Sequence, residues 1–150
     1  MELILWRHAE AVDGLPDMER NLTDKGLRQA ERMASFLRSR IPLDTRILVS
    51  PAKRAQQTAH ALTRYFITEP VIAPNCSVLS LLNAANWPDG DGCVLMVGHQ
   101  PVLGEAAARL LCDSQISFSV KKGAVWWLTG RFYDGDYQTN LRLVIAPDLL

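Results

Sequence analysis

The chain has 150 residues, of which 48% are hydrophobic and 21% are charged, values typical of one folded domain spanning residues 1–150. They exclude a disordered chain, and the 16 basic and 16 acidic residues cancel, so the overall charge predicts neither nucleic acid nor a membrane as a partner. Three cysteines without a Cys-x-x-Cys pair argue against a disulfide framework and against a zinc knuckle.

The start of the chain enters an apolar run directly, without the basic region and long apolar region of a secretory signal. No apolar run is long enough to cross a bilayer. We therefore expect a cytoplasmic protein.

Apolar runs alternate with helical repeats in the first part of the chain. The run at residues 3–6 predicts a buried strand. Apolar residues at three- and four-residue steps then predict a helix that is capped by Thr23 and ends near Arg40. Residues 46–49 predict a second buried strand, and Ser50 is expected to cap the helix that follows it.

That second helix is predicted to run to about residue 66. A short strand is expected at residues 71–73 and a short helix after Val78. The turn-rich residues 86–92 predict a loop. The most apolar strand is predicted at residues 93–97, and a further helix is predicted at residues 102–111.

The last part of the chain changes character and predicts strands at residues 116–120, 123–129 and 138–145. Residues 133–136 are expected to form the hairpin turn between the last two of these strands. Helices alternate with strands before this tail. The order therefore predicts an α/β fold, a three-layer α/β/α sandwich with a mostly parallel central sheet and an antiparallel addition.

Three of the predicted strands are followed by a cation or an imidazole: Arg7 and His8, Arg54, and His99. Ligands of open α/β sheets bind outside the carboxyl ends of the strands, so these side chains are expected to converge on one pocket. Arg54 lies one turn inside its helix and leans back over the strand end. The paired donors of arginine guanidinium groups match the oxygens of a tetrahedral phosphate dianion. The N-termini of two helices, the second beginning at Pro101, would also offer free N–H groups to it.

Each of these residues taken alone also fits a structural role, because polar residues commonly follow strands and begin helices. The convergence of three separate strand ends favours the phosphate pocket. His60, in mid-helix, is interpreted as a surface or packing residue, and the pair Trp126-Trp127 as a core and edge pair.

Four segments resemble the motifs of one family. They are Leu-Trp-Arg-His-Ala-Glu-Ala at residues 5–11, Arg-Asn-Leu-Thr-Asp-Lys-Gly at 20–26, Ser-Pro-Ala-Lys-Arg-Ala-Gln-Gln-Thr-Ala at 50–59 and Val-Gly-His-Gln-Pro at 97–101. Their order resembles the histidine phosphatase superfamily, which is also called phosphoglycerate mutase-like, over residues 1–112. The short chain most resembles the SixA-type phosphohistidine phosphatase branch, which implies a minimal fold without a large cap.

The resemblance implies that His8 is the nucleophile and that Arg7, Arg54 and His99 bind the transferring phosphoryl group. It also implies that Arg20 helps to bind phosphate. The neighbouring arginines disfavour a protonated His8, and positioning and electrostatics supply most of phosphoryl-transfer catalysis. No cofactor and no metal are expected, since no carboxylate–histidine cluster stands out in the sequence.

Larger members of the family carry an acid after the second helix, whereas residues 78–83 contain neither Asp nor Glu. An alkoxide leaves poorly without a proton donor, while a phosphoramidate is more labile. The missing acid therefore favours phosphohistidine over a phosphate ester. Asp89 and Asp91 are the alternative candidates for an acid, and Glu105 is a weaker one.

The favoured function is a metal-independent phosphatase that removes phosphate from phosphohistidine on a protein such as a phosphotransfer domain. Few residues remain to build a lid, so a shallow, open pocket is expected. A phosphatase of small phosphomonoesters and a non-catalytic phosphate-binding module remain as alternatives.

Overall fold

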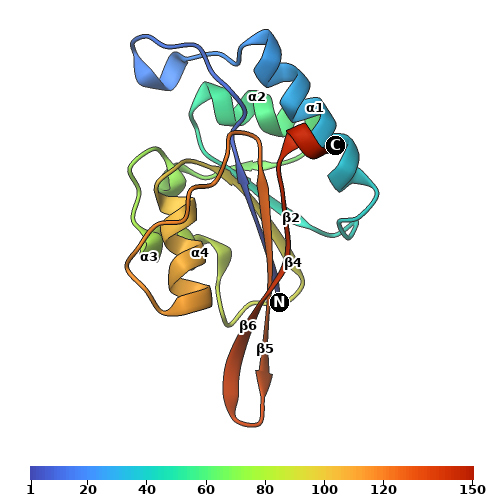
Figure 1. The fold of residues 1–150 in the computed structure, drawn as a ribbon, viewed down its shortest axis with the longest axis vertical. Helices are drawn as coiled ribbons and strands as arrows, with labels where there is room; N and C mark the ends of the chain where they lie inside the picture. The colour runs from blue at the N-terminus through green and yellow to red at the C-terminus, as the bar shows by residue number, and fades with distance from the viewer.

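The computed structural model describes residues 1–150, in which six strands form one sheet with helices on both faces (Figure 1). The strands are β1 (Glu2–Arg7), β2 (Arg46–Val49), β3 (Ile67–Thr68), β4 (Cys93–Gly98), β5 (Val125–Tyr133) and β6 (Asp136–Ile145). Their order in the sheet is β3-β2-β4-β1-β5-β6. The first four run parallel, and β5 and β6 add an antiparallel hairpin beside β1, which confirms the predicted mostly parallel α/β sheet.

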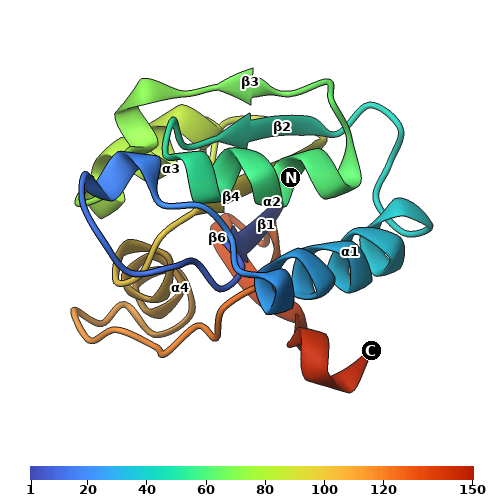
Figure 2. The same ribbon diagram turned by 90° about the horizontal axis from the view of Figure 1, so that it is seen from above.

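Two pairs of helices cover the two faces of this sheet, as Figure 2 shows from above. The first pair is α1 (Asp24–Arg38) and α2 (Lys53–Leu62), and the second is α3 (Val78–Ala85) and α4 (Val102–Cys112). Alternate residues of β1 separate the two cores, because Ile4 and Trp6 pack beneath α1 and α2 whereas Leu3 and Leu5 pack beneath α4. The predicted three-layer arrangement without a large cap is confirmed.

The first predicted helix follows its sequence signals closely. Thr23 is the N-cap of α1, and its Oγ1 accepts a hydrogen bond of 2.9 Å from the Gly26 amide. The buried residues of the helix are spaced at helical intervals and include Met33 and Leu37. The helix ends at Arg38, two residues earlier than predicted.

The second predicted helix differs at both ends. It begins at Lys53 with Ala52 as its N-cap, because the Ser50 hydroxyl is engaged with His99 instead of capping the helix. It ends at Leu62, since Thr63 adopts an extended backbone conformation.

Two predicted strands are wrong. In place of a strand at 71–73, the chain forms the short strand β3 and then a 3-10 helix at Pro70–Ile72. Residues 116–120 lie in the loop before β5, where Phe118 bonds to α4 instead of to a strand. Its carbonyl accepts a hydrogen bond of 2.8 Å from Gln100 Nε2. Its amide donates a hydrogen bond of 3.2 Å to the Gly104 carbonyl.

No helix in the structure combines the length and the apolar character that a membrane crossing requires. The longest helix, α1, has 15 residues and presents charged side chains along its exposed face.

Replacing Gly104 with alanine tests the packing of the 114–124 loop on α4. A Cβ at this position would collide with the backbone carbonyl of Phe118. Gly→Ala inside a helix ordinarily stabilises a protein by about 1 kcal/mol, whereas here we expect a loss of about 1–3 kcal/mol in the free energy of unfolding. Urea unfolding of the two proteins measures the difference, and a stabilised variant would contradict this packing.

Candidate active site

The predicted site residues meet where β1, β2 and β4 end. His8 follows β1 directly, His99 follows β4, and Arg54 reaches the same place from the first turn of α2. All three side chains are buried, with 8%, 2% and 4% of their residue surfaces exposed. The parallel pairing of β1 with β4, and of β4 with β2, brings these ends together.

The two ring nitrogens of His8 have different partners. Nδ1 lies 2.8 Å from the Ala9 carbonyl oxygen, which only accepts, so Nδ1 carries the proton. Nε2 therefore keeps a free electron pair, and Arg54 Nε donates to it at 3.3 Å. This is the tautomer that a nucleophilic Nε2 requires.

Thr58 holds the backbone that orients His8. The Ala9 amide donates to Thr58 Oγ1 at 3.1 Å, and that hydroxyl donates in turn to the Arg54 carbonyl at 2.7 Å. The carbonyl that fixes the His8 proton is thus tied to the helix that carries Arg54. Thr58 was missed as a functional residue by sequence reasoning, although it lies within the 50–59 motif.

His99 lies against both Arg54 and His8. Arg54 Nη2 lies 3.4 Å from His99 Nδ1, and the His8 and His99 ring centroids are 5.1 Å apart. His99 Nε2 lies 2.7 Å from Ser50 Oγ, which also accepts from the Ala52 amide. Ser50, predicted as a helix cap, therefore serves to position His99.

Both histidines are neutral at pH 7. Burial, followed by the positive charges of Arg54, Arg7 and Arg20, lowers the pKa of His8 to about 4, against the opposing hydrogen bond to Ala9. Burial, followed by His8 and Arg54, lowers the pKa of His99 to about 3. The arginines act in the predicted direction, but desolvation is the larger cause.

Arg7 and Arg20 hydrogen-bond to neither His8 nor His99. Arg7 Nη1 donates to the Val120 carbonyl at 2.7 Å, while its Nε is buried without a partner. Arg20 bonds through Nε to the Val12 carbonyl at 2.7 Å and through Nη1 to Asp17 Oδ1 at 3.1 Å. Arg20 is thus linked to the cluster through Asp17.

Asp17 covers the cluster and was missed by sequence reasoning. Its carbonyl accepts a hydrogen bond of 2.8 Å from Arg54 Nη1, and its Oδ2 lies 3.2 Å from Arg54 Nη2. It begins a 3-10 helix at Asp17–Glu19, within an exposed stretch whose sequence shows no hydrophobic periodicity. Asp17 therefore covers a buried cluster, in contrast to the open pocket that was expected.

The acids proposed from the sequence lie elsewhere. Asp91 lines a hollow with Arg46 and Cys93 at the start of β4, the opposite end from His99. Burial, followed by the charge of Asp89, raises the pKa of Tyr137 of β6, which places Asp89 near that phenol. Neither alternative aspartate lies at the site, because the loop that carries them joins the amino end of β4.

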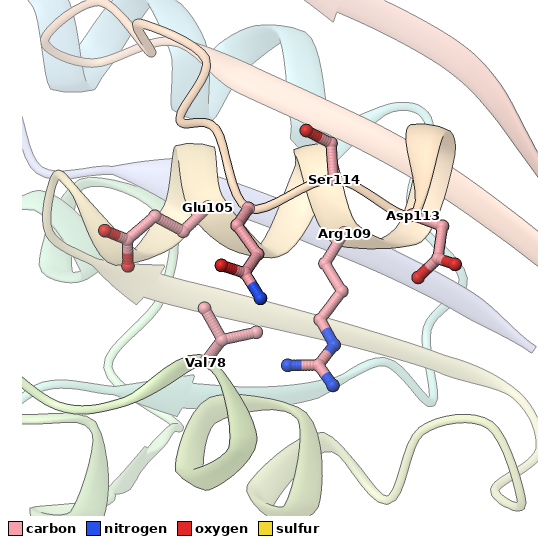
Figure 3. A pocket seen from close by; sticks show the side chains of 6 residues that line it. Val78, Glu105, Arg109, Asp113 and Ser114 are labelled. Atoms are coloured by element: carbon pink, nitrogen blue, oxygen red, sulfur yellow. The ribbon is translucent and has the colours of Figure 1, made fainter.

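Glu105 also points away from the cluster. It lines a pocket of about 260 Å³ with Val78 of α3 and Arg109 of α4, as Figure 3 shows. No three His, Cys, Asp or Glu side chains in the chain come together in an arrangement that could hold a metal ion.

The chain is similar in sequence and in fold to proteins of one family. A family model described as "Histidine phosphatase superfamily (branch 1)" matches residues 3–75. The chain is 31% identical over 120 residues to the phosphohistidine phosphatase SixA of Escherichia coli (strain K12), covering 73% of this chain and 74% of that protein. It is 33% identical over 127 residues to the phosphohistidine phosphatase SixA homolog of Haemophilus influenzae, covering 73% and 77%. The solved structure of the protein histidine phosphatase SixA complexed with tungstate matches with a TM-score of 0.80 and 25% identity over 99% of both chains.

The buried neutral histidines predict that acid destabilises the fold. Below pH 6.5 the unfolded chain binds protons at His8 and His99, whereas the folded protein does not do so until about pH 4 and 3. The free energy of unfolding should therefore fall with decreasing pH by about 1.4 kcal/mol per unit for each histidine. Urea unfolding between pH 5 and 7.5 measures this slope.

The same measurement on single variants shows how much of the pH dependence comes from each histidine. His99→Gln and His8→Gln should each remove about half of the effect between pH 5 and 6.5. An unchanged slope in both variants would show that these two imidazoles are not held neutral in the folded protein.

Proposed function

The chain belongs to the histidine phosphatase superfamily, and from this premise we propose that it is a metal-independent phosphohistidine phosphatase that works through a phospho-His8 intermediate. The observation that carries the proposal is the His8–Arg54 pair, in which the unprotonated Nε2 of a neutral imidazole accepts from a buried guanidinium. The names of the two similar SixA proteins support the same activity.

In the first step the Nε2 electron pair of His8 attacks phosphorus, and the bond from phosphorus to the leaving group breaks. Arg54 and Arg7 stabilise the charge on the phosphoryl oxygens. Arg7 contributes its buried, unpartnered Nε–H, and Arg54 contributes its Nε and Nη2. Arg20 adds positive charge at the edge of the site and binds phosphate less directly.

His99 completes the binding of the phosphoryl group. The Ser50 hydroxyl can donate to or accept from His99 Nε2, so either ring tautomer is accommodated. While Arg54 Nη2 donates to Nδ1, the ring proton of His99 is on Nε2 and points to Ser50. When Arg54 turns to the phosphate, Nδ1 takes up a proton from solvent and Nε2 releases one to solvent; Ser50 then donates to Nε2, and His99 presents Nδ1–H to a phosphoryl oxygen.

The substrate we propose is phosphohistidine on a protein, with the phosphorylated protein as partner and the cytoplasm as location. No acid lies at the position that serves ester hydrolysis in larger family members, since residues 78–83 contain neither Asp nor Glu. A phosphatase of small phosphomonoesters is the alternative on the same scaffold.

The substrate class is tested by offering the purified protein a phosphohistidine-bearing phosphotransfer domain and, separately, an aryl phosphate. We expect phosphate release from the first and little from the second. Efficient release from the aryl phosphate alone would favour the small-ester alternative. Inorganic phosphate binding without turnover of either compound would leave a binding module and contradict both enzymatic functions.

The nucleophile is tested with His8→Ala. This variant should lose turnover by at least about a thousandfold and should trap no acid-labile phosphoenzyme, because no other side chain replaces Nε2. His60→Ala is the matched control, since His60 lies outside the site against Phe66. Trapped phosphohistidine in the His8→Ala protein would refute the assignment.

A further inference from the structure

Asp17 is the carboxylate in direct contact with the cluster of His8, Arg54 and His99. Its Oδ2 lies 3.2 Å from Arg54 Nη2, and the same nitrogen lies 3.4 Å from His99 Nδ1. Arg54 Nε donates to His8 Nε2, so one guanidinium separates the carboxylate from the nucleophilic nitrogen. Asp17 therefore places a carboxylate on the guanidinium that also contacts His8 and His99.

The carboxylate can leave this position without unfolding its segment. The Asp17 backbone carbonyl is bound separately to Arg54 Nη1 at 2.8 Å, and that bond does not involve the side chain. The other carboxylate oxygen, Oδ1, is bound to Arg20 Nη1 at 3.1 Å, which keeps the side chain at the edge of the site. Figure 2 shows this segment, coloured blue, beside the start of α2.

The other nearby carboxylates are committed elsewhere. Glu10, two residues after His8, bonds to Thr23 Oγ1 at 3.0 Å and pairs with Lys25. Glu105 faces α3, and Asp91 lies at the far end of β4. Among the carboxylates of the 12–20 segment, Asp17 alone contacts Arg54, which makes it the carboxylate nearest to the reacting groups.

We propose that Asp17 is a catalytic residue that gives up Arg54 Nη2 to the arriving phosphoryl group and then acts as general base on the water that hydrolyses phospho-His8. This role rests on the proposed function and names the general base that the sequence does not identify. Hydrogen bonding to Arg20, with Arg54 adding to it, lowers the pKa of the Asp17 carboxyl, so the base form predominates at pH 7.

The hydrolytic step is balanced without a further reactant. The water oxygen forms a bond to phosphorus, and Asp17 accepts one proton from that water. The P–N bond breaks, and its electron pair returns to Nε2 of His8. The products are inorganic phosphate and neutral His8, and the proton on Asp17 passes to solvent.

The two steps can be separated with phosphoramidate as the phosphoryl donor. Its monoanion carries a protonated leaving nitrogen, so formation of phospho-His8 needs no acid from the protein. In Asp17→Asn we expect phospho-His8 to form at close to the wild-type rate and to be hydrolysed about a hundredfold or more slowly. Rapid-quench trapping of the acid-labile phosphoenzyme measures both rates.

Two further variants separate this role from a structural one. Asp13→Asn removes the same charge from the same segment, but Asp13 reaches only Arg20, at 3.9 Å, and this variant should behave as the wild type. Asp17→Glu keeps a carboxylate and should recover part of the hydrolysis rate.

Three results would overturn the proposal. They are hydrolysis of phospho-His8 at the wild-type rate in Asp17→Asn, an equal loss of rate in formation and in hydrolysis, and an equally slow hydrolysis in Asp13→Asn. If the wild-type protein forms no phosphoenzyme at all, the proposed function fails and this role fails with it. Melting temperatures of all three variants show whether any loss comes from unfolding.

Discussion

The guanidinium of Arg54 is the group on which the site depends, because it contacts the residue after β1, the residue after β4 and the 12–20 segment. Its Nε reaches His8 after β1, its Nη2 reaches His99 after β4, and its Nη1 reaches the Asp17 carbonyl. A buried cation is costly unless polar partners surround it. The parallel order of β2, β4 and β1 supplies those partners by bringing their carboxyl ends together.

Burial and hydrogen bonding determine how this cluster is charged. His8 and His99 stay neutral chiefly because they are desolvated, and the nearby arginines add to the effect. Once both rings are neutral, their carbonyl and hydroxyl partners decide which nitrogen carries the proton. The path from Thr58 through Ala9 to His8 Nδ1 leaves Nε2 unprotonated, and Arg54 Nε donates to it. The nucleophile is thus prepared by the fold, which reduces the reorganisation needed for phosphoryl transfer.

The sequence predicted the parts of this arrangement that depend on local pattern. Strand runs, helical spacing and the Thr23 cap are local features, and the strand ends then placed His8, Arg54 and His99 together. Contacts made between distant segments left no such pattern. The position of Ser50 predicts a helix cap, whereas its hydroxyl lies beside His99. The 116–120 run alternated like a strand, yet Phe118 bonds to Gln100 and Gly104. Asp17 lies in an exposed segment where no period applies.

The position of Asp17 follows from the positive charges of the site. A site with Arg7, Arg20 and Arg54 around two neutral histidines is suited to a dianion, and without an anion its cations would repel one another. Asp17 offsets part of that repulsion through Arg54 Nη2 and Arg20 Nη1. A phosphoryl group brings more negative charge than one carboxylate, so it competes favourably for Arg54. The displaced carboxylate is then left next to the phosphoryl group, which is where a base for the hydrolytic water is required.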